Sequence, residues 1–298
     1  MGKAIRNILI GSAVLACMGA GLFGVYAAEN DRGTVTDTVS VDSFDKLDID
    51  TSGTDIIIKE GSSNSVSYRV KKKREPVINE NDGRLTVKTK ALTTHFNFLS
   101  WDKEYIEITL DKDTLENVTL DTGSGDVNIE GISLGGKIKG GSGDLMLSGC
   151  RGGRDVVIER GSGDIKLEDC EFGKLSKEQG SGDLAADNVT ADTAALRSSS
   201  GSTSLSSCNI GTIKHKSGSG DITGKEMTLD STDIETSSGE VTLMLSGSES
   251  GHDYDLSASS GDIIVGGNKF SNNYTEDNGA GNTIRVKTSS GDIGIDFN

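Results

Sequence analysis

An acidic residue follows a glycine at regular intervals through the second half of the chain, and these carboxylates are the first candidates for chemistry. The glycines lie 18, 20, 19, 19, 19, 19, 22 and 30 residues apart, with serine replacing the acid once, at position 202. If the repeat stacks equivalent positions, a line of carboxylates results: Asp126, Asp144, Asp164 and Asp183. Neighbouring carboxylates repel, and Ca²⁺, which prefers oxygen ligands, would relieve the repulsion. We favour the alternative, in which each acid hydrogen-bonds its own turn and no metal or other cofactor is needed.

The residues that follow each acid indicate the structure of the repeat. One and three positions after the acid, sixteen of eighteen residues are apolar, whereas the residue between them is mostly polar or small. This alternation is typical of a strand with one buried face. A unit of about 19 residues is too short for a strand–helix–strand crossover but fits one turn of a β-solenoid. We therefore predict an all-β fold, a right-handed parallel β-helix with coils of about 19 residues.

The chain divides into three predicted regions. Residues 1–28 form a membrane anchor or signal segment, residues 29–116 a β region that caps the solenoid, and residues 117–298 the repeat solenoid. In the capping region, Asn81-Asp82-Gly83 is a hairpin signal. Residues 266–282 lengthen the last interval, and because they are polar and rich in Gly and Asn, they predict a surface loop. The three cysteines of the repeat region are predicted to be buried free thiols: Cys150, Cys170 and Cys208.

The N-terminal region has the pattern of an export or anchor segment. Lys3 and Arg6 precede an uncharged apolar run of 21 residues, Ile8 to Ala28, which is long enough to span a bilayer core of about 30 Å. Basic residues before this run predict a cytoplasmic N-terminus, a single-pass topology and a C-terminal domain outside the cell membrane. We favour a retained anchor over a cleaved signal peptide with its site near Ala27, and over a lipoprotein modified at Cys17.

The candidates for binding lie in the capping region. The net charge of −16 argues against nucleic acid as a partner, because phosphate backbones are bound by basic surfaces. One basic run and one aromatic cluster stand out from this acidic background, and they comprise Lys71, Lys72, Lys73 and Arg74, followed by Phe96, Phe98 and Trp101. Together they predict a contact surface for anionic lipid or wall polymer near the membrane. The alternative is a solvated strand end with aromatic residues covering the end of the core.

Few features point to catalysis. The three histidines lack a metal-binding spacing, and no nucleophile motif is present in the sequence. A carbohydrate-active β-helix enzyme would use acidic and basic residues on an outer face, and Asp155, Arg160 and Lys166 are available for that role. Nothing in the sequence singles these three out, so we predict no catalytic residues.

The order of several motifs resembles that of a known family. After the N-terminal segment come Thr51-Ser52-Gly53-Thr54-Asp55-Ile56, Asp82-Gly83-Arg84-Leu85-Thr86-Val87, Ile106–Leu110 and the repeated Gly-Ser-Gly-Asp. This order resembles the bacterial "putative adhesin" β-strand-repeat family of unknown function, which includes LiaG-like envelope-stress proteins, over residues 35–298. The resemblance implies a membrane-attached, outward-facing bacterial protein, and it supplies no catalytic residues.

These observations predict a non-enzymatic, membrane-anchored extracytoplasmic β-solenoid that acts as an adhesin-like or envelope-stress interaction module. The stress role follows from the family resemblance alone. The expected partners are the membrane, through the N-terminal helix, and a cell-wall polymer or envelope protein. Two alternatives stay open, a carbohydrate-active β-helix enzyme and a calcium-stabilised structural rod.

Overall fold

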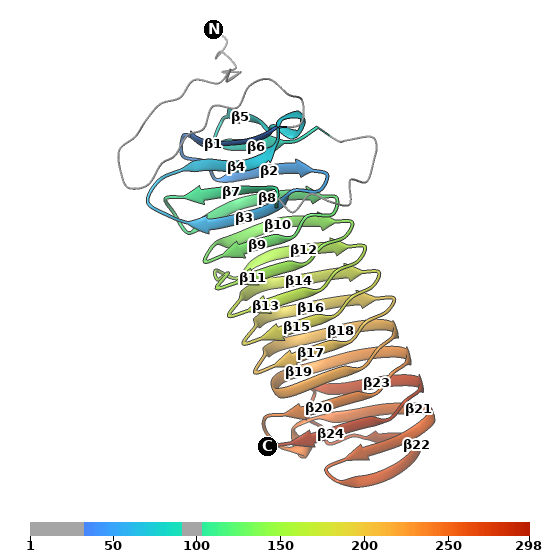
Figure 1. Ribbon diagram of the computed structural model, residues 1–298. Coiled ribbons are helices and arrows are strands. Elements are labelled where there is room, and N and C mark those ends of the chain that lie inside the picture. The colour runs from blue at the N-terminus through green and yellow to red at the C-terminus, as the bar shows by residue number, and fades with distance from the viewer. Residues whose placement is uncertain (1–32, 91–102) are drawn as a thin grey trace.

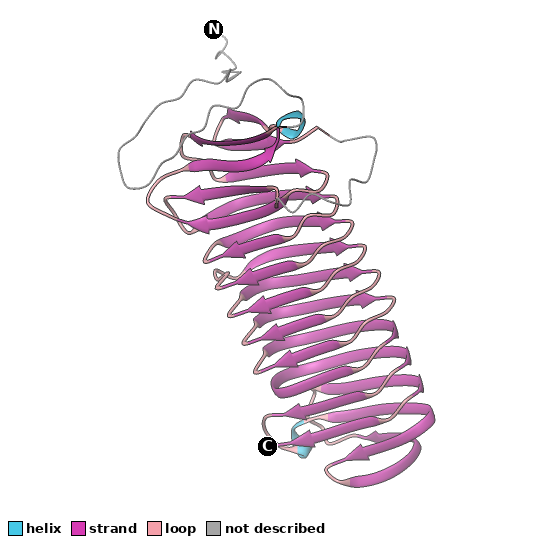
Figure 2. Cartoon of the chain, viewed as in Figure 1, coloured by secondary structure: helices cyan, strands magenta, loops and turns pink. Residues whose placement is uncertain are grey.

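The computed structural model describes residues 33–90 and 103–298, which form a long β-solenoid (Figure 1). Strands dominate these residues, and the helices among them are two short 3₁₀ turns, Lys72–Arg74 and Glu249–Gly251 (Figure 2). None of the helices in the described ranges is long and apolar enough to cross a membrane. The predicted anchor, residues 1–28, and the aromatic cluster with Phe96, Phe98 and Trp101 lie outside the described residues.

Two parallel ladders of strands run along the solenoid. The first consists, in spatial order, of β6 (Arg84–Lys88), β2 (Lys46–Thr51), β8 (Thr114–Thr122), β10 (Ser133–Gly140), β12 (Arg154–Arg160), β14 (Glu171–Gln179), β16 (Thr190–Ser198), β18 (Asn209–Ser219), the second part of β19 (Ile222–Ser238), β23 (Thr283–Ser290) and the first part of β21 (Asp253–Val265). The second consists of β7 (Tyr105–Leu110), β3 (Asp55–Glu60), β9 (Val127–Glu130), β11 (Leu145–Ser148), β13 (Ile165–Glu168), β15 (Leu184–Asp187), β17 (Thr203–Ser206), the first part of β19, β20 (Val241–Leu245), β24 (Ile293–Phe297) and the last part of β21.

Successive coils pair in register at the predicted period. Ile165 pairs with Leu184, and Leu184 pairs with Thr203, so that equivalent residues are 19 positions apart. Because in-register parallel pairing places equivalent side chains above one another, the apolar positions after each acid become continuous columns in the interior. Leu147 and Leu167, for example, are completely buried. The prediction of an all-β parallel β-helix with coils of about 19 residues is confirmed.

A second interior column lies at the opposite corner of the coil. All of its members are at most 2% exposed, namely Ile132, Cys150, Cys170, Val189, Cys208 and Met227. The predicted burial of the three thiols is therefore confirmed, and each is unbridged. The Cys208 thiol lies 3.2 Å from the Ser206 carbonyl oxygen, and burial raises the pKa of this thiol.

At both ends, the order of the coils in space differs from their order in the sequence. The coil β23–β24 lies between the coil that contains β20 and the terminal coil β21. Likewise, β2–β3 lies between β8–β9 and the outermost coil β6–β7. At the N-terminal end, the chain forms the inner coil β2–β3 before the outermost coil β6–β7, and then returns inward to β8–β9. At the C-terminal end, it forms the terminal coil β21 first, and β23–β24 then takes the place between that coil and β20.

Antiparallel strands cover the two ends. At the N-terminal end, β4 (Ser65–Lys71) pairs with β7 and β1 (Thr34–Ser40), and β5 (Val77–Asn81) pairs with β6 (Figure 1). We call β1, β4, β5 and the turn Lys72–Arg74 the N-terminal cap. The predicted hairpin turn joins β5 to β6, with positive φ at Asp82 (47°) and Gly83 (71°). At the other end, β22 (Asn268–Glu276) pairs with β21, so the loop predicted over residues 266–282 is wrong for most of its length.

Candidate functional site

The carboxylates of the repeat connect successive coils. Oδ1 of Asp126 accepts a hydrogen bond from the backbone N–H of Asp144 at 2.9 Å. Oδ1 of Asp144 accepts the N–H of Asp164 at 2.8 Å, and Oδ1 of Asp164 accepts the N–H of Asp183 at 2.9 Å. Each acid thus bonds to the next coil, which corrects the expectation that it bonds to its own turn. We call this series the acid ladder.

The acid ladder also bears on calcium. Oδ1 of each of these four carboxylates already accepts a hydrogen bond from a backbone N–H group. In residues 33–90 and 103–298, no cluster of three or more Asp, Glu, His or Cys side chains is arranged to hold a metal ion. Calcium binding by Asp126, Asp144, Asp164 and Asp183 therefore stays an untested prediction that the geometry does not favour.

The three residues considered for an enzyme site contact different partners and do not contact one another. Arg160 is only 4% exposed, so its expected position on the outer face is wrong. Its guanidinium donates inside the solenoid to the Gly143 carbonyl and to Thr122 Oγ1. Lys166 lies 2.6 Å from Glu168, and Asp155 accepts a backbone N–H from the next coil. No shared reaction centre follows from these contacts.

Two basic residues that the sequence interpretation missed lie in the core. Lys177 is 2% exposed and His215 is 1% exposed, on either side of Leu196 in one interior column. Burial lowers the pKa of Lys177 to about 8, although Asp183 opposes the shift. Burial, followed by the charge of Lys177, lowers the pKa of His215 to about 4. The equivalent positions in the adjoining coils hold the aliphatic residues Ile158, Leu196 and Ile234. An alignment of the repeats would therefore have placed Lys177 and His215 in the interior.

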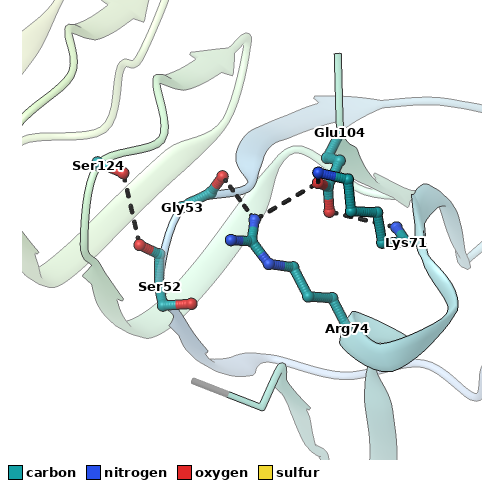
Figure 3. Close-up of polar contacts among 6 residues, drawn as sticks. All are labelled: Ser52, Gly53, Lys71, Arg74, Glu104 and Ser124. Atoms are coloured by element: carbon teal, nitrogen blue, oxygen red, sulfur yellow. Dashed lines mark hydrogen bonds and ion pairs between the residues drawn. The ribbon is translucent and has the colours of Figure 1, made fainter. Parts of the chain in front are cut away.

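The basic run of the cap divides into two pairs with different roles. Figure 3 shows Lys71 and Arg74 converging on Glu104, and both cations lie 3.5 Å from its Oε1 atom. The backbone N–H of Lys71 donates to Oε2 of the same carboxylate at 3.2 Å. Arg74 also reaches the Gly53 carbonyl at 3.5 Å. Lys71 and Arg74 therefore attach the N-terminal cap to the first coils.

We expect Glu104→Gln to lower the free energy of unfolding by about 1–2 kcal/mol, because it leaves two partly buried cations without their counter-charge. The Glu104 side chain is only 11% exposed, so solvent screens these pairs weakly. Urea unfolding and amide exchange in β4 and β7 measure the effect. The matched control is Glu107→Gln, since the more exposed Lys59–Glu107 pair should contribute at most about 1 kcal/mol. Equal losses in the two variants would contradict this role.

The other two lysines of the run border a cavity. It has a volume of 290 Å³, and its lining includes Tyr68, Lys72, Lys73, Val77, Ile78 and Lys90. We call it the cap cavity. A wider, shallower groove of 580 Å³ runs along the first ladder, and its one lysine, Lys139, is already paired with Glu159 of the next coil at 3.4 Å. The cap cavity is therefore the better candidate contact site.

The fold and this site define a β-solenoid with a covered N-terminal end that carries a basic, partly apolar cavity. The chain belongs to the family described as Toastrack DUF4097, whose profile matches residues 44–296. No curated protein gives a significant match.

Several solved structures are similar to the chain. A protein from Parabacteroides distasonis, described as a "putative lipid binding protein", is 15% identical with a TM-score of 0.49, over 89% of this chain and 96% of the other. A "putative adhesin" from Bacteroides fragilis is 15% identical with a TM-score of 0.44, over 88% and 97%. A "putative adhesin" from Parabacteroides merdae is 14% identical with a TM-score of 0.46, over 89% and 96%.

Proposed function

We propose that this protein is a non-enzymatic, membrane-anchored module of the bacterial envelope, which presents an adhesin-like contact surface outside the cell. The acid ladder is the observation that carries the proposal. The carboxylates of the repeat, which were the first candidates for chemistry, connect one coil to the next instead. The repeat thus builds a rod, and contact with a partner is left to the cap and the outer walls.

The construction of the rod supports a role as a rigid spacer. Eleven described strands stack in the first ladder, which at about 4.8 Å per step gives a length of roughly 50 Å. Backbone hydrogen bonds of the two parallel ladders run along the stack, and the acid ladder adds side-chain bonds between the coils from Asp126 to Asp183, so that each coil is held by its neighbours. Such a rod suits a protein that holds a contact surface at a fixed distance from the membrane. A role in the envelope-stress response rests on the family resemblance alone.

Co-sedimentation with purified bacterial wall material tests the proposal. Residues 29–298 would be mixed with wall material in the presence of calcium or of a chelator, and soluble sugar released over time would be measured. Saturable binding without sugar release, in both solutions, supports the interaction module. Sugar release would favour the carbohydrate-active enzyme, and loss of the fold on chelation would favour the calcium-stabilised rod. Absence of binding would contradict wall polymer as the partner and leave an envelope protein.

A further inference from the structure

The cap cavity carries ammonium groups without a carboxylate partner in the described part of the chain. Lys72, Lys73 and Lys90 are exposed and line the cavity together. The lining also holds two carboxylates, since Glu75 accepts the Tyr68 hydroxyl at 3.3 Å and Glu80 accepts a backbone N–H at 2.6 Å. Neither forms an ion pair with these lysines among the residues that the structure describes, but both keep their negative charge. The cations of the lining thus outnumber its carboxylates by three to two, in a chain whose net charge is −16, and this local excess of positive charge favours an anionic ligand.

The same cavity has an apolar side. Val77 is 49% exposed, and it is one of two large hydrophobic residues exposed among those the structure describes. Pro76 and Ile78 flank it on the same lining. An apolar surface beside free ammonium groups matches a ligand that joins an anionic group to hydrocarbon.

The cavity also lies where the chain enters the solenoid from its N-terminal segment. The backbone N–H of Lys72 donates to the carbonyl of Gly33, the first described residue, at 2.9 Å. Gly33 is five residues after Ala28, the last residue of the apolar run. A fully extended chain of that length spans at most about 18 Å. If the apolar run ends at the membrane surface, Gly33 is held within that distance of the lipid headgroups, and the Lys72 backbone lies one hydrogen bond farther away.

We propose that the cap cavity binds the phosphate headgroup of an anionic phospholipid in the membrane that holds the chain, an inference that rests on the proposed membrane attachment. Lys72, Lys73 and Lys90 contact the phosphate oxygens, and Val77 lies against the glycerol and upper acyl carbons. Each lysine near an anionic surface strengthens binding by about fivefold. The bound headgroups orient the rod, so that the N-terminal cap faces the membrane and β22 points outward.

Lysine acylation of the full chain in lipid nanodiscs tests the inference. Discs of phosphatidylcholine alone are compared with discs containing one part in three phosphatidylglycerol, and labelling at each lysine is followed by mass spectrometry. We expect Lys72, Lys73 and Lys90 to react at least about fivefold more slowly in the anionic discs. The protection should disappear in 1 M salt, where the screening length falls to about 3 Å. Lys174 and Lys214, exposed on the solenoid wall, should react equally in both discs.

Matched lysine variants and an added soluble wall polymer distinguish lipid binding at the cap cavity from other causes of protection. Lys72→Gln/Lys73→Gln should remove most of the protection at Lys90, whereas Lys174→Gln/Lys214→Gln should leave it unchanged. Equal labelling of the cap lysines in both discs would overturn the inference. Protection that requires added soluble anionic wall polymer would overturn the choice of lipid. Retention of the chain on discs after an alkaline wash is measured separately, and its absence would contradict the membrane attachment itself.

Discussion

Replacing Gly163 with alanine is expected to lower the free energy of unfolding by about 3–5 kcal/mol, the largest loss we expect from one methyl group. Gly163 has a φ of 95°, a conformation that side chains resist. A Cβ atom there would also overlap the carbonyl oxygen of Gly143 in the preceding coil. The corner glycines approach one another this closely along the stack, so relief of the overlap at Gly163 requires separating two coils and weakening the acid ladder between them.

Gly131→Ala separates the two causes of that loss. Gly131 also has a positive φ, 69°, but its Cβ would meet nothing within 4 Å. This variant should lose only about 1 kcal/mol, the conformational part of the cost. Urea unfolding followed by circular dichroism measures both variants, and amide exchange in β11 and β13 locates the effect of Gly163→Ala. Similar losses in the two variants would show that contact between coils adds little.

The middle of the solenoid was predictable because the 19-residue repeat determines which residues of successive coils pair. Once residues 19 apart are stacked, the apolar alternation after each acid determines which face is interior, and the pairing of Leu184 with Thr203 follows. The ends were not predictable in this way. The 30-residue last interval indicated an insertion, but the position of the coil β23–β24, between β21 and the coil that contains β20, depends on long-range contacts. The covering strand β22 packs Tyr274 on Tyr254, with ring centroids 5.7 Å apart, and no local signal encodes that contact.

The candidate site was only partly predictable for a related reason. Lys71 to Arg74 form one run in the sequence, and the sequence alone gives no reason to assign different roles to its four cations. Glu104, which comes from the start of the neighbouring β7 region, engages Lys71 and Arg74 and leaves the middle pair at the cap cavity. The sequence does not show that Glu104, thirty residues after Arg74, is the carboxylate that pairs with it. Lys177, in contrast, could have been found by aligning the coils, because its column neighbours are Ile158 and Leu196.

That column position leads to the second large expected effect. Lys177→Leu should raise the free energy of unfolding at pH 7 by about 3 kcal/mol, because the pKa of the buried ammonium falls from 10.5 to about 8. The protonated form is therefore disfavoured in the folded protein. Leucine has a suitable shape for a column that already holds Ile158 and Leu196, so little strain should accompany the exchange.

The pH dependence distinguishes removal of this charge from a general gain in packing. Between pH 8 and 10.5 the unfolded chain keeps a proton on Lys177 that the folded protein has released, so wild-type stability should rise with pH across this window relative to Lys177→Leu. Below pH 8 the advantage of the variant is complete, and above 10.5 the charge-related part of it vanishes. Lys174→Leu, an exposed position on the same strand β14, should change stability by at most about 0.5 kcal/mol at any pH. A difference between wild type and Lys177→Leu that stays constant from pH 7 to 11 would assign the gain to packing and reject the buried charge as its cause.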